Sequence, residues 1–221
     1  MDPTPETYRE ARRVLDEAIG NIVDRPQIID AFRQIPRHLF VPPHLAEQAY
    51  DDRALPLVEG QTISQPTMIA LMLDALDPHP GDRVLEVGAG SGYAAALLSV
   101  LVREVHAVEI RPTLVPMARE ALAKAGIGNV RVHLRDGSLG LPEFAPFDRI
   151  LVSAGTAIVP EPLVSELAPG GRLVIPIGTD EGQRLQIARR SADGASIEWE
   201  RGAHCLFVPL VHGSRHPSGT T

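Results

Sequence analysis

The order of apolar and polar residues predicts three helices in the N-terminal third of the chain. Apolar side chains recur at the spacing of one helix face over residues 6–19 and 24–35. Pro26 fits the first turn of the second helix, and Pro36 ends it. A further run of the same kind predicts a helix over residues 66–76.

From residue 81 onward, short apolar runs alternate with longer amphipathic ones. The apolar runs predict strands at residues 83–87, 104–109, 130–134, 148–152 and 172–177. The amphipathic runs predict helices at residues 91–101, 112–125 and 161–167. The end of the chain lacks a helical pattern and predicts strands at residues 184–190, 196–200 and 205–210. This order predicts an α/β fold with a doubly wound, mostly parallel sheet, N-terminal helices and antiparallel terminal strands.

A long segment without regular periodicity, residues 38–65, precedes this alternating part. Its prolines and Gly60 argue against long helices or strands. Because long loops inside compact domains are usually functional, we expect this one to hold substrate. We expect one domain over residues 1–212, with N-terminal helices and substrate loop (1–80), a cofactor-binding core (81–178) and antiparallel strands (179–212). Residues 213–221 form a polar tail that we expect to be disordered.

Composition narrows the choice of partner and compartment. The 221 residues are 44% hydrophobic and 22% charged, which is typical of one soluble domain. A net charge of −7 and the lack of a dense Lys/Arg run argue against a nucleic-acid partner. Cys205 is the only cysteine, and no apolar run reaches the roughly 18 residues that a membrane span needs. We therefore expect a cytoplasmic monomer that has no membrane partner.

A glycine-rich turn follows the first predicted strand and opens a helix. The three glycines Gly88, Gly90 and Gly92 are spaced G-x-G-x-G, and glycine lets backbone lie close to a ligand. A dinucleotide site has G-x-G-x-x-G instead, with pyrophosphate on the helix N-terminus. The spacing here favours a ligand without a pyrophosphate, which we interpret as S-adenosylmethionine, with S-adenosylhomocysteine as product.

Acidic residues stand at or near the ends of three successive strands, where ligands bind in open α/β sheets. Glu109 follows Gly88 by 21 positions, which is typical of a carboxylate that accepts from ribose hydroxyls. Asp136 is suited to accept from an adenine amino group. Each has an alternative role: Glu86 can pair with Arg83, Glu109 can cap the next helix, and Asp136 can form a turn. Taken together they predict a cofactor site of Glu86, Gly88, Ala89, Gly90, Ser91, Glu109, Ile110, Asp136, Gly137 and Ser153.

Several kinds of methyl acceptor do not fit the residues present. The fourth strand ends in Val152-Ser153-Ala154-Gly155, without the Asn/Asp-Pro-Pro-aromatic pattern of amino-methylating enzymes. Pyrimidine methylation needs a cysteine nucleophile, but Cys205 lies in an apolar run and is better interpreted as a small buried side chain. The eight histidines show no zinc-ligand spacing, and no cluster of oxygen ligands stands out. We therefore predict no metal.

The loop before the first strand carries the most specific motif, Gly60-Gln61-Thr62-Ile63-Ser64-Gln65-Pro66. Here the chain resembles the protein L-isoaspartyl (D-aspartyl) O-methyltransferase family, which has a near-identical heptapeptide just ahead of its cofactor motif. The resemblance runs from Ile35 to Leu210 and includes the segments 147–150 and 167–178.

The resemblance implies a seven-stranded, Rossmann-like class I methyltransferase that methylates the free carboxylate of L-isoaspartyl residues in damaged proteins. The ester then closes to a succinimide, which reopens partly to aspartate. Ser64 is implied as the catalytic residue, and we expect substrate binding at Thr62, Ile63, Ser64, Gln65 and Val208. A carboxylate with a reference pKa of about 3.9 is already ionised at neutral pH and needs no general base.

Alternative interpretations stay open at several of these residues. Ser64 also suits a helix N-cap two residues before Pro66. Arg37 and Arg53 can steer an acidic substrate or form surface salt bridges. The second interpretation of the whole chain is a relative that methylates an ordinary aspartate of a biosynthetic peptide to form aspartimide. A third is a binding module without turnover, although it would be expected to lack Ser64 or Glu109.

Three positions depart from the family pattern. Ala89 replaces a threonine, Arg135 replaces a glycine, and Ser153-Ala154-Gly155 replaces a Thr-Ala-Ala run. The loss at Ala89 is only a hydroxyl. Arg135 precedes Asp136 and can narrow the adenine pocket, and the 153–156 segment borders the expected methyl-transfer region. The last change is the one hint toward the aspartyl peptide.

Overall fold

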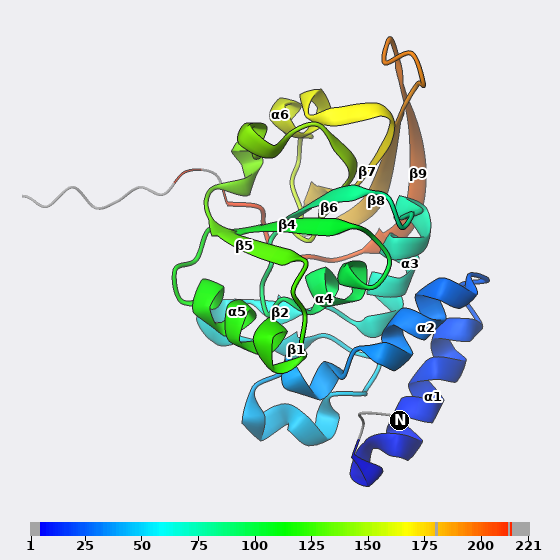
Figure 1. Cartoon of the computed structure of the whole chain (residues 1–221), viewed down its shortest axis with the longest axis vertical. Coiled ribbons are helices and arrows are strands. Elements are labelled where there is room, and N and C mark those ends of the chain that lie inside the picture. Colours follow the sequence, from blue (N-terminus) through cyan, green and yellow to red (C-terminus); the bar gives the residue numbers. More distant parts are fainter. Residues whose placement is uncertain (1–4, 180, 212, 214–221) are drawn as a thin grey trace, which may run out of the picture.

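The computed structural model describes residues 5–179, 181–211 and 213. Its centre is a seven-stranded sheet in the order β5-β4-β3-β6-β7-β8-β9 (Figure 1). Four parallel pairs join β5 through β7, and two antiparallel pairs join β7 to β8 and β8 to β9. The strands are β3 (Arg83–Val87), β4 (Glu104–Glu109), β5 (Val130–Leu134), β6 (Phe147–Val152), β7 (Leu167–Thr179), β8 (Gly182–Arg190) and β9 (Ile197–Cys205). The predicted fold class is therefore confirmed.

The strand order reverses between β3 and β6. The chain runs outward from β3 to β4 and β5, then returns to the other side of β3 as β6. Ligands of open α/β sheets bind beyond the carboxyl ends of the strands at such a reversal. The ends of β3, β4 and β6 therefore define where a ligand site is expected.

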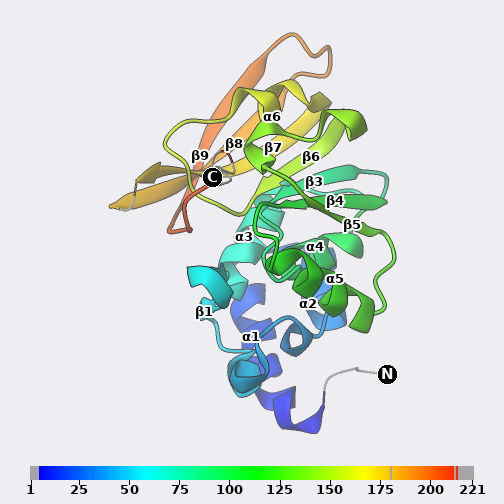
Figure 2. The ribbon, with the colours of Figure 1, turned by 90° about the vertical axis from the view of Figure 1, so that its left-hand side faces the viewer.

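Helices cover both faces of the sheet, because side chains of the central strands alternate between two apolar cores. In β3, Val84 packs in the larger core, whereas Leu85 and Val87 pack in the smaller one. The larger core lies under α3 (Pro66–Leu76), α4 (Tyr93–Ser99) and α5 (Leu114–Lys124), and α6 (Glu161–Ser165) covers the opposite face (Figure 2).

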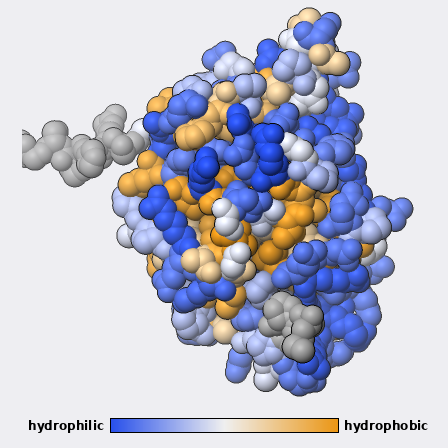
Figure 3. Space-filling model, viewed as in Figure 1, coloured by the Kyte–Doolittle hydropathy of each residue, from blue (hydrophilic) through white to orange (hydrophobic). Residues whose placement is uncertain are grey.

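The N-terminal region packs against the layer that α3 and α4 form. It contains α1 (Arg9–Gly20) and α2 (Pro26–Gln34), preceded by a short 3-10 turn, Glu6–Tyr8. Residues 38–65 hold only short elements, as the prolines predict. These are 3-10 turns at Arg37–Leu39, Pro43–Gln48 and Val58–Gly60 and a two-stranded hairpin of β1 (Leu55–Pro56) and β2 (Thr62–Ile63). Hydrophilic residues cover this region in Figure 3, whereas apolar residues gather nearer the sheet.

Some element boundaries differ from the sequence-based ones. The helix predicted over 91–101 begins only at Tyr93, because Gly92 has a left-handed φ of +86°. The strand predicted over 172–177 begins at Leu167, where the helix predicted over 161–167 has already ended. Residues 196–200 lie in one longer strand, β9, which ends at Cys205.

The strand predicted over 205–210 is wrong. Only Cys205 belongs to a strand, and Pro209, which has no N–H to donate, forms a single bridge with Gly155. Residues 214–221 of the predicted tail lie outside the described residues. The division of the chain into parts stays a prediction. Within the described part of the chain, no helix is long and apolar enough to cross a membrane.

Candidate active site

The glycine turn after β3 has the backbone that its sequence requires. Gly88, Gly90 and Gly92 have φ values of +91°, +54° and +86°, a region that side chains with a Cβ rarely enter. The amides of Gly88 and Ala89 both donate to the Val108 carbonyl, at 2.9 and 3.1 Å. The turn is thus joined to β4 and exposes its backbone at the strand reversal.

Glu109 fastens this turn to the end of β4. One carboxylate oxygen accepts from the Gly90 amide at 2.9 Å, and the other accepts from the Arg111 amide at 2.9 Å. The next helix, α5, begins at Leu114, so Glu109 does not act as its N-cap. Arg111 in turn donates to Glu59 at 2.8 Å, which connects the end of β4 to the loop before β2.

Glu86 is a buried acid whose carboxylate lacks a partner within the described part of the chain. The residue is 1% exposed, and neither oxygen has a hydrogen bond. Its predicted alternative partner, Arg83, instead bonds Glu104 at 2.8 Å. Burial raises the pKa of Glu86 well above its usual value, and the negative charge of Glu109 adds to this. A cationic group in the adjoining cavity would satisfy this carboxylate.

Two adjoining cavities open between the glycine turn and the loop before α3. Both are lined by Thr62, Gly88, Gly90 and Ser153. Of the other predicted site residues, the first cavity includes Ile63, Ser64, Glu86, Ala89 and Ser91, and the second includes Glu109, Ile110, Gly137 and Val208. Apolar residues that were not predicted complete the first cavity, namely Ile69, Met72, Tyr93, Ala94 and Leu151.

Two predicted site residues line neither cavity. Gln65 turns its amide toward Asp52, to which it donates at 2.9 Å. Asp136 accepts from the Ser138 amide and hydroxyl at 2.9 and 2.6 Å, so its carboxylate forms the turn that was its alternative interpretation. Its neighbour Gly137 does line the second cavity.

Ser64 lies at the end of the loop and lines the first cavity. The N-cap position of α3 is Gln65, which makes no side-chain cap. The carboxylate of Asp52 performs that task, since it accepts from the Thr67 amide and hydroxyl at 3.0 and 2.9 Å. The N-cap interpretation of Ser64 is therefore wrong.

The two arginines near this loop differ. Arg37 has no solvent exposure, and its Nη2 donates to the Ser64 carbonyl at 3.0 Å, so its predicted place on the surface is wrong. It begins the turn Arg37–Leu39, and its side chain packs on the buried Tyr93 ring. Arg53 is exposed and bonds Asp51 at 3.1 Å, as a surface salt bridge does.

The segment that follows β9 forms the far wall of the second cavity. Gly155 donates to the Val208 carbonyl at 2.8 Å and accepts from the Leu210 amide at 2.6 Å. The buried amide of Gln183 accepts from the Phe207 N–H at 2.8 Å and donates to its carbonyl at 3.1 Å. A Cβ on Gly155 would lie 2.4 Å from the Gln183 nitrogen. Glycine at this position therefore leaves room for the Gln183 clasp, by which we mean the two hydrogen bonds between the Gln183 amide and the Phe207 backbone.

The remaining departures from the family pattern are accommodated without obstructing the cavities. Arg135 bonds Glu143 at 2.6 Å and lines neither cavity, so it does not narrow the predicted adenine pocket. Ala89 lines the first cavity, and it lacks the hydroxyl of the threonine that the family pattern has at this position. No group of three or more metal-ligating side chains is found among the described residues.

Comparison with known proteins shows the relationship. The family model described as protein-L-isoaspartate(D-aspartate) O-methyltransferase (PCMT) matches residues 10–215. The chain belongs to this family. The protein-L-isoaspartate O-methyltransferase of Roseiflexus castenholzii is 50% identical over 204 residues, which cover 92% of this chain and 93% of that one. Its counterpart from Aeropyrum pernix is 49% identical over 218 residues, covering 95% and 84%.

Solved structures agree with this placement. The beta-aspartate methyltransferase (PCMT) of Plasmodium falciparum, determined in complex with S-adenosyl-L-homocysteine, is 28% identical, with a TM-score of 0.78. The match covers 90% of this chain and 98% of that one. Membership of this family gives the chain S-adenosylmethionine-dependent protein-L-isoaspartate O-methyltransferase activity, which acts in protein repair.

Proposed function

We propose that this methyltransferase binds S-adenosylmethionine along the glycine turn and that Ser64 orients the isoaspartyl carboxylate for methylation. The observation that carries the proposal is the shared cavity, which is lined by Ser64, by the glycine turn and by Glu86, whose carboxylate has no hydrogen bond within the described residues. When bound, S-adenosylmethionine supplies a methyl group on a cationic sulfur.

The chain's own residues fit that cofactor. Glu86 is suited to hold its ammonium group, because a buried carboxylate without a partner gains most from a cation. Glu109 lines the second cavity and is suited to accept from ribose hydroxyls, and Gly137 offers backbone near an adenine. Gly88, Ala89, Gly90, Ser91, Ile110 and Ser153 complete the proposed cofactor site. Asp136, whose Oδ1 accepts from Ser138, and Gln65, whose amide donates to Asp52, stay predictions for the adenine and the substrate.

The acceptor needs orientation rather than activation. At neutral pH a carboxylate is ionised and nucleophilic, so no general base is required. The Ser64 hydroxyl can donate to one oxygen and leave the other free to attack, whereas a cation in that position would stabilise the resting carboxylate. Thr62, Ile63 and Val208 line the cavities beside it and are suited to hold the peptide backbone. Orientation of reacting groups is worth up to roughly 7–11 kcal/mol in well-aligned systems.

The substrate that we propose is a protein or peptide containing L-isoaspartate, methylated by a monomeric enzyme in the cytoplasm without a nucleic-acid partner. An aspartyl peptide is the alternative, and the changed segment Ser153-Ala154-Gly155 is the observation that favours it. Ser153 and Ala154 of this segment line the second cavity together with Val208, where an acceptor peptide would bind.

Two peptides that differ only in isoaspartate or aspartate test this choice. Each is incubated with the enzyme and methyl-labelled S-adenosylmethionine, and the methanol that is released from the ester is counted. We expect turnover on the isoaspartyl peptide. Turnover on the aspartyl peptide alone would overturn the repair substrate and support the alternative.

A further inference from the structure

Arg37 is a buried cation that lies behind the first cavity and does not line it. Its side chain is fully buried, and it lines neither cavity. Its Nη2 donates to the Ser64 carbonyl at 3.0 Å, and its guanidinium carbon lies 4.7 Å from the centroid of the Tyr93 ring. Its Nε and Nη1 have no hydrogen-bond partner within the described ranges.

A cation in this position is costly for the fold. Burial lowers the pKa of Arg37, and the neighbouring Tyr93 and Asp52 only partly oppose this. Burying a charge is unfavourable unless its hydrogen bonds are satisfied, and replacing buried charges by apolar side chains often leaves a protein equally stable. A methionine of similar length would therefore serve the packing alone. The arginine must contribute something that packing does not need.

The two contacts of Arg37 are with residues of two different segments that both line the first cavity. Ser64 belongs to the loop before α3, and Tyr93 begins α4 directly after the glycine turn. Both residues line the first cavity. Tyr93 is 2% exposed, and Phe40 packs on its ring at a centroid distance of 5.5 Å, so the ring is a fixed support. Arg37 thus connects the Ser64 backbone to the start of the helix that carries the glycine turn.

We propose that Arg37 is a positioning residue for methyl transfer, which holds Ser64 in register with the glycine turn through the Ser64 carbonyl and the Tyr93 ring. The proposal rests on the role proposed above for Ser64. Arg37 does not touch the acceptor, and its charge stays behind the backbone. The carboxylate therefore meets the neutral Ser64 hydroxyl and keeps its reactivity. Displacement of a reacting group by about 1 Å can cost on the order of 10²-fold in rate.

The variants Arg37→Met and Arg37→Lys test this. We expect Arg37→Met to lower kcat on an isoaspartyl peptide by roughly 10-fold to 10²-fold. The dissociation constant of S-adenosylhomocysteine, measured by calorimetry, should stay within about twofold, because no cofactor-side hydrogen bond is lost. Lysine keeps the charge but lacks the planar fork, so Arg37→Lys should recover only part of the kcat. The melting temperature of Arg37→Met should be equal to that of the parent or higher.

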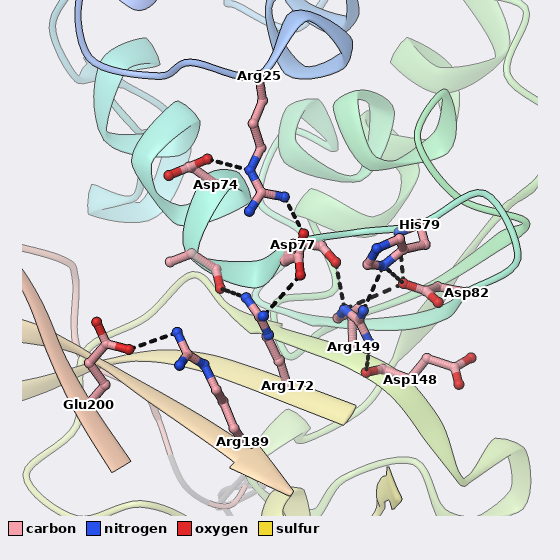
Figure 4. Close-up of polar contacts among 11 residues, drawn as sticks. Arg25, Asp74, Asp77, His79, Asp82, Asp148, Arg149, Arg172, Arg189 and Glu200 are labelled. Atoms are coloured by element: carbon pink, nitrogen blue, oxygen red, sulfur yellow. Dashed lines mark hydrogen bonds and ion pairs between the residues drawn. The ribbon is translucent and has the colours of Figure 1, made fainter. Parts of the chain in front are cut away.

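Arg149 provides the matched control. It is also buried, and it donates to the backbone carbonyls of Asp77 and Asp148, both at 2.8 Å (Figure 4). It lies near the start of β6, at the opposite end of the strand from Ser153. Arg149→Met should lower the melting temperature, because it leaves Asp82 without its partner at 3.4 Å. The kcat of its folded fraction should match that of the parent.

Three results would overturn the proposal. The first is parent-like kcat in Arg37→Met, and the second is an equal loss of kcat and of affinity for S-adenosylhomocysteine. The third is failure of both Arg37 variants to fold, which would show that Arg37 serves the fold alone. If Arg37→Met alone does not fold, Arg37→Lys decides, and parent-like kcat there overturns the proposal. Full activity in Ser64→Ala would remove the role of Ser64 itself. Loss of activity in Ser64→Ala beside parent-like kcat in Arg37→Met would remove only the role of Arg37.

Discussion

The two sides of the active-site cavities are built in different ways. On the cofactor side, Glu86, the glycine turn and Glu109 come from the ends of neighbouring strands, so the sheet itself brings them together. On the acceptor side, the segments 62–64 and 207–210 are short and largely irregular and are held by buried side chains of distant residues. Those side chains are Arg37 and Gln183. Changes on one side should therefore leave binding on the other side nearly intact.

Ser64→Ala is expected to have the largest effect, because it removes the proposed hydrogen-bond donor to the acceptor. Loss of one positioned donor lowers kcat by roughly 10²–10³-fold. The affinity for S-adenosylhomocysteine should change little, since Ser64 belongs to the acceptor side. Steady-state kinetics with an isoaspartyl peptide and calorimetry with S-adenosylhomocysteine measure the two quantities. Parent-like kcat in this variant would remove Ser64 from the proposed site.

Glu109→Gln is the matching change on the cofactor side. Glu109 accepts from Gly90 and Arg111, and in the proposed complex also from ribose hydroxyls. Hydrogen bonds to charged groups contribute about 1.5–3 kcal/mol each, so we expect S-adenosylmethionine to bind roughly 10-fold to 10²-fold more weakly. At saturating cofactor, kcat should fall much less. A loss that is confined to kcat would place Glu109 outside the cofactor site.

Glu86→Gln tests two effects of the Glu86 carboxylate, namely its proposed bond to the cofactor and the cost of burying its charge. The proposed bond to the cofactor ammonium weakens when the charge is removed, so we expect a roughly tenfold lower affinity for S-adenosylmethionine. The pKa of Glu86 is raised in the folded protein above its ordinary value of 4.5. The folded state therefore keeps this proton to higher pH than the unfolded chain does. The free energy of unfolding falls as the pH rises from that ordinary value toward the raised one.

The pH dependence supplies a second readout for Glu86→Gln. Without ligand, the parent should lose stability relative to Glu86→Gln as the pH rises through this range, which paired urea titrations measure. Identical pH profiles of the two proteins would contradict the burial of an ionisable carboxylate at this position.

Gln183→Ala should have the smallest effect on activity. It should change the binding of the peptide and leave the binding of the cofactor unchanged. It leaves the Phe207 amide and carbonyl without their buried partner, at a cost of about 1–3 kcal/mol in the free energy of unfolding. The segment that carries Val208 should loosen and raise the KM for the peptide several-fold. Differential scanning calorimetry and peptide kinetics measure both effects. An increase in the cofactor KM instead would contradict the division into two sides.

The difference between the cofactor side and the acceptor side also explains which site residues could be predicted from the sequence alone. The cofactor side was predictable because glycines with positive φ and acids at strand ends leave a local signal, as Gly88, Gly90 and Glu109 do. Ser64 was found through the heptapeptide that surrounds it. Gln183 left no signal, because it clasps Phe207 only after the two segments meet in the fold. Ile69 and Met72 were indistinguishable from core residues, since their helix is apolar on several faces.

Arg37 and the segment 205–210 mark where local patterns mislead. An arginine beside prolines and a histidine resembles a surface residue, yet Arg37 is fully buried and packs on the Tyr93 ring. Alternating apolar residues over 205–210 resemble a strand, but Pro209 and the Gln183 clasp set a different backbone. In both cases the tertiary environment overrides the local pattern.

A crystal structure of the enzyme with S-adenosylhomocysteine and an isoaspartyl peptide tests the central claim most directly. The account predicts that one oxygen of the isoaspartyl carboxylate accepts from the Ser64 hydroxyl, while the ammonium of the cofactor product meets Glu86. Arg37 should keep its contacts with the Ser64 carbonyl and the Tyr93 ring, as it has them without ligands, and should not touch the carboxylate. A carboxylate bound to Arg37, or bound beyond hydrogen-bond reach of Ser64, would contradict the account.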